Sequence, residues 1–487
     1  MRNAGSYRVT LIALTVLATA MYAYPWLRLG MDFEIDLNEG WNGYEQMLAM
    51  TGASIYSGAG PLYFNNYPPL SFYLVGALGL ALGDPVLAGR LLSVLATGAI
   101  AVCCGVVARA GGGGRRESWL AFATALGLFS AFATDYVGVN DPQILAQAFL
   151  CAGFALYVRR PDSPARLAWV AVLFGLGLLI KHNVLALPLA VTLHILWRGP
   201  SAARWVYLGV GLALAGLATF VIYLLFGDEF FHQLLASRVY DVTRGFLLVM
   251  EMLSRLQAPL AVAGLYLIVA GRGRVDALVA AYLVIGLLIG IGFSGGAGID
   301  INVFFDVMIA LAMGTGLAAA WVGRQTGLPA SAPAILALAA NAGIILFSPQ
   351  ALGRLAVDAL GEMEERQRLF REDVAYLRSI PGPAICESHL LCLRAGKPML
   401  MDPFGVLQAT LTGRLPPDRF TGMLQRREIA VLQISSTREH PADEAPGMQV
   451  MPQRFVNFSD AVFDELDRSY RVGRVGLSGR FHLPRPD

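Results

Sequence analysis

Acidic residues gather in two short polar stretches that separate apolar segments. MDFEIDLNEG contains Asp36 and Glu39, and DYVGVNDP contains Asp141. A carboxylate in a cleft beside a membrane has a raised pKa and can accept a proton from a hydroxyl group. The pattern therefore indicates a general base at the membrane surface. For Asp36, a solvated loop acid or a helix N-cap is an equally good interpretation.

Asp141 stands directly before Pro142, which is the usual arrangement at the start of a helix. Proline at the first helical position lacks an N–H that would be unpaired there, and the preceding aspartate caps the helix. An acid near lipid is costly, whereas serine would cap as well. We therefore predict that Asp141 caps a helix and also orients a substrate or a metal ion.

Basic residues lie in two places where an anion could be bound. Lys181 and His182 end an apolar segment, and Arg238 and Arg244 lie in the polar stretch 227–255, which we predict to be an outer loop. Arginines on the outer side oppose the usual charge bias of membrane proteins, so they favour an anion-binding role. Lys181 could meet a phosphate as a compact cation, or could extend to the membrane interface.

A third polar stretch, SGGAGIDINVFFD, places Asn302 and Asp306 one helical turn apart at the start of an apolar segment. Both side chains can then face one cavity, although polar packing between helices is the competing interpretation. No His/Cys cluster has the spacing of a structural metal site, and no phosphate-binding loop motif is present.

Composition shows what must position these residues. The chain has 487 residues, of which 56% are hydrophobic and 15% charged. Apolar runs of about twenty residues recur, which is typical of a polytopic α-helical membrane protein. The net charge of +2 is too small to indicate a nucleic-acid partner. The predicted spans are 8–29, 86–108, 118–133, 142–158, 167–181, 183–197, 205–226, 256–270, 276–293, 303–321 and 330–348.

The apolar segment 69–82 is too short for a span and is bounded by prolines, so we predict a juxtamembrane helix there. With this segment left out, the loops 134–141 and 294–302 fall outside and contain no basic residue. Eleven spans then place the N-terminus in the cytoplasm and the C-terminus outside, by the positive-inside rule.

From about residue 350 the composition becomes charged and mixed, which divides the chain into a membrane domain, 1–349, and an exported α/β domain, 350–487. AICES, KPMLMD and IAVLQI have the pattern of short strands, and HLLCLRAG and MLQRREI that of short helices. Cys386 and Cys392 lie in this domain, either paired or as free thiols.

The order of these motifs resembles a known superfamily. Asp36 with Glu39, NYPPL (66–70), AGRLLSVLATG (88–98) and NDP (140–142) follow one another as in the GT-C membrane glycosyltransferases. The resemblance is to the group of protein O-mannosyltransferases and aminoarabinose transferases, and it covers roughly residues 9–321.

The resemblance implies an inverting hexosyl or pentosyl transfer from a polyprenyl-phosphate donor to an envelope glycan, lipid or protein, at the outer face of the cytoplasmic membrane. It assigns catalytic acids to Asp36 and Asp141; the base is either Asp36 or Glu39, because many members have a Glu directly after the first acid. A divalent metal ion is left open, since its use varies within the superfamily. The expected substrate-binding residues are Asn66, Tyr67, Asn140, Lys181, His182, Arg238, Arg244 and Asn302.

Two other classes of function compete with this one. A transporter or flippase of lipid-linked sugars would have polar residues spread through mid-membrane depth. A non-catalytic envelope-assembly scaffold would not depend on Asp36 or Asp141. The acids at the predicted outer ends of spans favour the enzyme.

Overall fold

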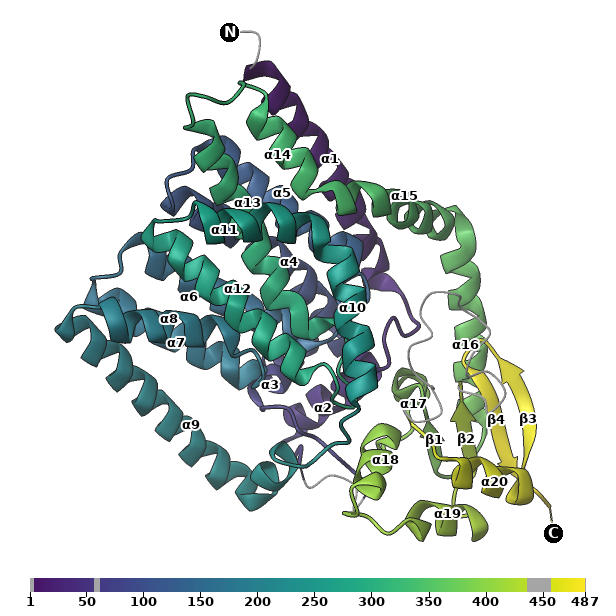
Figure 1. Ribbon diagram of the computed structural model, residues 1–487. Coiled ribbons are helices and arrows are strands. Elements are labelled where there is room, and N and C mark those ends of the chain that lie inside the picture. Colours follow the sequence, from purple (N-terminus) through teal and green to yellow (C-terminus); the bar gives the residue numbers. More distant parts are fainter. Residues whose placement is uncertain (1–3, 57–61, 436–456, 487) are drawn as a thin grey trace.

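The computed structural model describes residues 4–56, 62–435 and 457–486, which form a helical bundle and a smaller region with a β-sheet (Figure 1). The bundle consists of α1 (Ala4–Leu27), η1 (Arg28–Gly30), α2 (Asn38–Thr51), α3 (Leu70–Leu82), α4 (Pro85–Ala110), α5 (Arg115–Phe132), α6 (Pro142–Arg159), α7 (Pro164–Ile180), α8 (Ala186–Arg198), α9 (Ser201–Leu234), α10 (Val242–Pro259), η2 (Leu260–Gly264), α11 (Leu265–Val269), α12 (Arg274–Phe293), η3 (Ile301–Phe304), α13 (Phe305–Gly323), α14 (Ala332–Ala340) and α15 (Ala342–Val357).

The chain continues through η4 (Asp358–Glu362), α16 (Met363–Ser379), β1 (Ala384–Cys386), α17 (His389–Arg394), α18 (Pro403–Leu411), α19 (Asp418–Gln425), β2 (Val431–Ile434), α20 (Asp460–Ser469), β3 (Tyr470–Gly476) and β4 (Gly479–Pro484). The bundle and the sheet lie at opposite sides of Figure 1, with α2, α17 and α18 between them.

Seven helices among the described residues are long and apolar enough to cross a membrane. α13 lies at the centre, where its small residues allow close packing: a Cβ on Gly316 would meet Ala108 and Ala121. α9 lies along the edge of the bundle and is almost unburied, as an apolar helix in contact with lipid would be (Figure 1). The protein is a polytopic α-helical membrane protein, as the sequence predicts.

A helix or a pair of helices stands at each predicted span. Two of the predictions need correction. The stretch 227–255 is mostly helical rather than a loop, because α9 continues to Leu234 and α10 begins at Val242. The span 330–348 is divided at Asn341 into α14 and α15. α15 passes residue 350 and leads through η4 into α16, so the domain boundary at this residue stays a prediction.

The sheet has the order β1-β2-β4-β3, with β1 and β2 parallel and the other pairs antiparallel. Side chains alternate across it, as the period of a strand requires. Val431 packs with α16 and α17, whereas Leu432 and Ile434 pack with α19 and α20. Both faces of the sheet are therefore covered by helices.

The predicted strands at AICES and IAVLQI and the helix at HLLCLRAG correspond to β1, β2 and α17. The helix predicted at MLQRREI overlaps only the end of α19, which stops at Gln425. The predicted strand at KPMLMD is wrong. This segment forms no strand, and its Asp402 caps α18 through a hydrogen bond from the Gly405 N–H. The hairpin of β3 and β4 was not predicted, because its alternating arginines and glycines lack an apolar stripe.

The sheet region contacts the bundle mainly where α17 lies on α2. Gly40 is required there, since a Cβ at this position would overlap the backbone of Leu390. Glu34 accepts hydrogen bonds from Gly40 N–H in the bundle and from Ser388 Oγ in the sheet region. A disulfide joins Cys386 to Cys392 and closes the loop that carries Ser388.

Candidate active site

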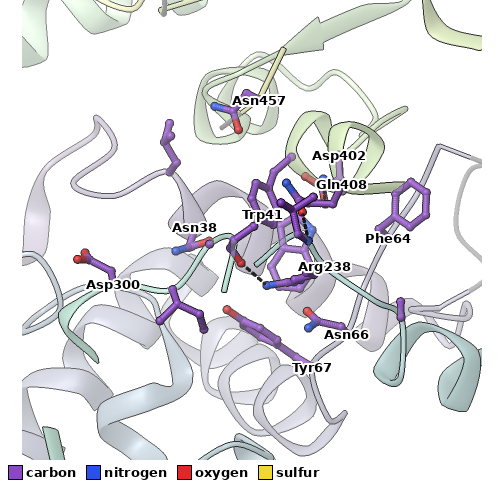
Figure 2. Close-up of a pocket in the computed structure, with 18 of the residues that line it drawn as sticks. Asn38, Trp41, Phe64, Asn66, Tyr67, Arg238, Asp300, Asp402, Gln408 and Asn457 are labelled. Atoms are coloured by element: carbon purple, nitrogen blue, oxygen red, sulfur yellow. Dashed lines mark hydrogen bonds between the residues drawn. The ribbon is translucent and has the colours of Figure 1, made fainter. Parts of the chain in front are cut away.

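A cavity of about 850 Å³ lies between the sheet region and the adjacent end of the bundle. Such a volume is typical of a small-molecule site. Figure 2 shows its walls: Asn38, Asn66 and Tyr67 come from the bundle, whereas Asp402, Gln408 and Asn457 come from the C-terminal region. Arg238, from the connection between α9 and α10, lies between these two groups.

A buried ion pair holds the loop that carries Asp36. Arg90 is 1% exposed, and its Nε and Nη2 donate to the two carboxylate oxygens of Glu39 at 2.8 and 2.7 Å. Its remaining N–H groups donate to the carbonyls of Met31 and Phe33. One side chain of α4 therefore fixes the backbone of the whole first loop, as the planar, five-donor guanidinium allows.

Glu39 also joins the first loop to the second. Its Oε1 accepts a hydrogen bond from Asn140 N–H at 3.0 Å, and its Oε2 accepts one from Ile35 N–H at 2.8 Å. The side chain of Asn140 is hydrogen-bonded to Gln46 of α2. Glu39 and Asn140 are thus occupied in holding the two loops together and do not line the cavity.

Asp36 lines the cavity, and its Oδ1 accepts a hydrogen bond from Asn38 N–H at 2.8 Å. Burial, together with the charges of Asp141, Glu39 and Asp300, raises the pKa of Asp36 to about 7, although the hydrogen bond from Asn38 N–H lowers it. A carboxyl group with this pKa is suited to proton transfer near neutral pH.

Asp141 caps α6 as predicted, through a hydrogen bond from Gln143 N–H at 2.7 Å. Its other carboxylate oxygen lies 3.9 Å from Lys181 Nζ, which stands 3.5 Å from the ring centre of Tyr67. Lys181 is 3% exposed, so it does not extend to the membrane interface. The carboxylate and the aromatic face together stabilise this buried cation beside the cavity.

Arg238 and Arg244 both line the cavity but differ in their partners. Arg244 donates to the carbonyls of Gly296 and Ile299, and so holds the loop before α13. Arg238 is exposed and stacks 5.1 Å from the ring centre of Phe404, with one long hydrogen bond of 3.5 Å to Ala297. Arg238 therefore has donors to offer to an anion, whereas both terminal nitrogens of Arg244 already donate to backbone carbonyls.

The structure places seven of the predicted site residues in the cavity wall: Asp36, Asn66, Tyr67, Asp141, Arg238, Arg244 and Asn302. Lys181 lies behind Asp141 and Tyr67. His182 follows it with a buried, unpartnered Nδ1, and burial lowers its pKa to about 4. Asp306 is not in the wall; it accepts a hydrogen bond from Tyr282 of α12, as a packing residue would.

Sequence reasoning missed the residues of the C-terminal wall, namely Glu387, His389, Asp402, Phe404, Gln408, Arg414 and Asn457. It also missed Arg90 and Asp300. The sequence did contain a signal for a role of Arg90. It lies inside the apolar run 86–108, where an unpaired charge is costly. Among the described residues, no three His, Cys, Asp or Glu side chains are grouped to hold a metal ion.

The sequence matches no protein-family model and no curated protein, but solved structures match its fold. ArnT from Cupriavidus metallidurans in the apo state matches 99% of this chain and 100% of its own, with a TM-score of 0.60 at 14% identity. The same protein bound to undecaprenyl phosphate matches 98% and 99%, with a TM-score of 0.58 at 15% identity.

The archaeal oligosaccharyltransferase AglB from Archaeoglobus fulgidus, in complex with an inhibitory peptide and a dolichol-phosphate, matches 98% of this chain and 74% of its own. Its TM-score is 0.53 at 13% identity. The chain therefore shares the fold of ArnT and of AglB, which agrees with the resemblance of its motifs.

We predict that Arg90→Met lowers the free energy of unfolding by about 3–5 kcal/mol, because it leaves Glu39 buried without a counter-charge. Arg368→Met is the control, since its partner Glu365 is at the surface and such pairs contribute about 0–1 kcal/mol. Unfolding of the purified variants in mixed micelles measures both. Equal losses would show that the Arg90 pair is not an anchor.

Proposed function

We propose that this protein transfers a sugar from a polyprenyl-phosphate carrier to a hydroxyl group of an envelope acceptor, as a hexosyl or pentosyl transferase that inverts the sugar's anomeric centre. The observation that carries the proposal is Asp36, with a pKa of about 7, in a cavity that also contains Arg238 and adjoins Lys181. A base and cations facing one space are what transfer from a phosphate leaving group requires.

In this mechanism Asp36 accepts the proton of the acceptor hydroxyl, and the oxygen of that hydroxyl attacks the anomeric centre of the sugar. Among the described residues, the carboxylate of Asp36 has one backbone partner, whereas that of Glu39 is occupied by Arg90, Ile35 and Asn140. Asp36 is therefore assigned as the base and Glu39 as a positioning residue. Asp141 holds Lys181, and Asn302 lies in the same wall.

Arg238 and Lys181 balance the negative charge that develops on the departing phosphate. Tyr67 lies against Lys181, and Asn66 precedes it in the same wall, so this part of the cavity would receive the phosphate end of the donor. Arg244 holds the loop before α13, and His182 follows Lys181. The structures of ArnT with undecaprenyl phosphate and of AglB with a dolichol-phosphate support a carrier of this kind.

The proposed location is the cytoplasmic membrane, with the cavity and the sheet region on the outer side. The Cys386–Cys392 disulfide supports this orientation, because disulfides persist in oxidising compartments. The 13 residues of α3 fit a helix that lies at the interface rather than a span. A transporter is less well supported, since the acids of the cavity lie at helix ends and loops rather than at mid-membrane depth.

We predict that a strain carrying Asp36→Asn as its only copy loses a sugar from one envelope glycan and accumulates the polyprenyl-phosphate donor, as a deletion strain does. Removing a general base lowers turnover by about 10²–10⁴-fold. The control is Asp32→Asn in the same loop, whose surface pair with Arg371 is dispensable. Unchanged glycans and lipids in the deletion strain would exclude the proposed transfer.

The pH dependence of transfer provides a second test of Asp36. The base acts only when deprotonated, and its pKa is about 7. Turnover should therefore fall about tenfold per pH unit below pH 7 and level off above it. Initial rates with purified protein and isolated donor measure this profile. A profile that is flat down to pH 5 would remove Asp36 from the role of base.

We predict that Lys181→Met and Arg238→Gln each weaken binding of undecaprenyl phosphate about ten- to a hundredfold, since a hydrogen bond to a charged group contributes about 1.5–3 kcal/mol. Arg426→Gln, at a surface pair with Glu428, is the control. Titration of the lipid against protein in nanodiscs measures the affinities. Unchanged affinity in both variants would place the phosphate elsewhere, with Arg255 the next candidate.

A further inference from the structure

The C-terminal wall of the cavity contains a buried imidazole that has a hydrogen-bonding atom to spare. His389 is 7% exposed and lines the cavity, and its ring donates a hydrogen bond to the backbone of Met401. Its Nε2 has no partner among the described residues. Burial lowers the pKa of His389 to about 4, so at neutral pH the ring is uncharged and Nε2 is an acceptor.

Two carboxyl groups of the same wall add further acceptor atoms. Asp402 is 9% exposed and uses one oxygen to cap α18, through Gly405 N–H. Glu387 accepts hydrogen bonds from Ser435 and from the side chain of Asn457. The disulfide-closed loop places Glu387 and His389 on one side, and α18 places Asp402 beside them.

Aromatic rings complete this part of the cavity. Trp41 is 8% exposed, and its Nε1–H has no partner among the described residues. Phe64 and Phe404 also line the wall, and arginines stack on their rings: Arg414 on Phe64 and Arg238 on Phe404. This part of the cavity therefore combines apolar ring faces with hydrogen-bond acceptors.

The chemistry of this wall discriminates between ligand classes. A phosphate offers only acceptors and a negative charge, so it is unfavourable beside Asp402, Glu387 and the Nε2 of His389. A sugar offers several hydroxyl donors and a C–H face that packs on an aromatic ring. Beside these three groups the wall thus fits a ligand with many hydroxyl groups better than an anion, whereas Arg238 and Arg414 are the groups of the wall that could attract an anion.

We infer that His389, Asp402 and Trp41 form a binding subsite for a sugar ring of the acceptor, so that the acceptor is a glycan or a glycolipid rather than a protein. The inference rests on the proposed function and names its acceptor class. On the proposed function the phosphate of the donor lies between Lys181 and Arg238, which leaves the part of the C-terminal wall around His389 and Asp402 for the second substrate.

The test uses the full-length protein in nanodiscs and a panel of methyl glycosides, with N-acetylserinamide and inorganic phosphate as the competing ligand classes. Binding is followed by saturation-transfer NMR. At least one methyl glycoside should bind, and Asp402→Asn and His389→Phe should each weaken it about tenfold or more. Asparagine is also a good N-cap, so Asp402→Asn keeps α18 intact.

One variant serves as the control and should bind the glycoside like the wild type. Asp418→Asn changes an exposed acid at the start of α19, away from the cavity. The inference is overturned if no glycoside binds, if binding does not depend on Asp402 and His389, or if serinamide or phosphate binds there instead. Transfer that depends on Asp36 would then still stand.

Discussion

The site depends on the ion pair and the hydrogen bonds that the guanidinium of Arg90 makes. Burying this group costs several kcal/mol unless its donors are filled, as they are here by Glu39 and the carbonyls of the first loop. Because Glu39 in turn accepts the N–H of Asn140, the same pair sets the distance between the two acidic loops. The acids that line the cavity take no part in this hydrogen-bond network. Repulsion between their carboxylates therefore does not weaken it.

The first loop also fixes the position of the C-terminal region. Glu34 accepts the Ser388 hydroxyl, and the α2 helix that starts after Asp36 carries the close contact of Gly40 with Leu390. The disulfide limits the movement of the loop that includes Ser388. A shift of this loop would therefore change the base and the C-terminal wall together, because both are attached to the same segment.

Local signals in the sequence predicted much of this arrangement. Apolar runs gave the helices, Asp141 before Pro142 gave a true N-cap, and short apolar runs gave β1 and β2. The partner of Glu39 could not be predicted, since Arg90 lies far along the chain and only packing brings them together. KPMLMD was predicted as a strand because of its apolar residues. Its last residue, Asp402, stands before Pro403 and is in fact a helix N-cap.

The cluster of carboxyl groups also affects the protonation of Asp36 when the donor is bound. Asp141, Glu39 and Asp300 already raise the pKa of Asp36, and the phosphate of a bound donor would raise it further, since like charges favour the protonated form. The positive charges of Lys181 and of Arg238 in the cavity wall would oppose this rise in the pKa of Asp36. On the proposed mechanism, these cations have two effects: they balance the leaving phosphate, and they keep Asp36 deprotonated while the donor is present.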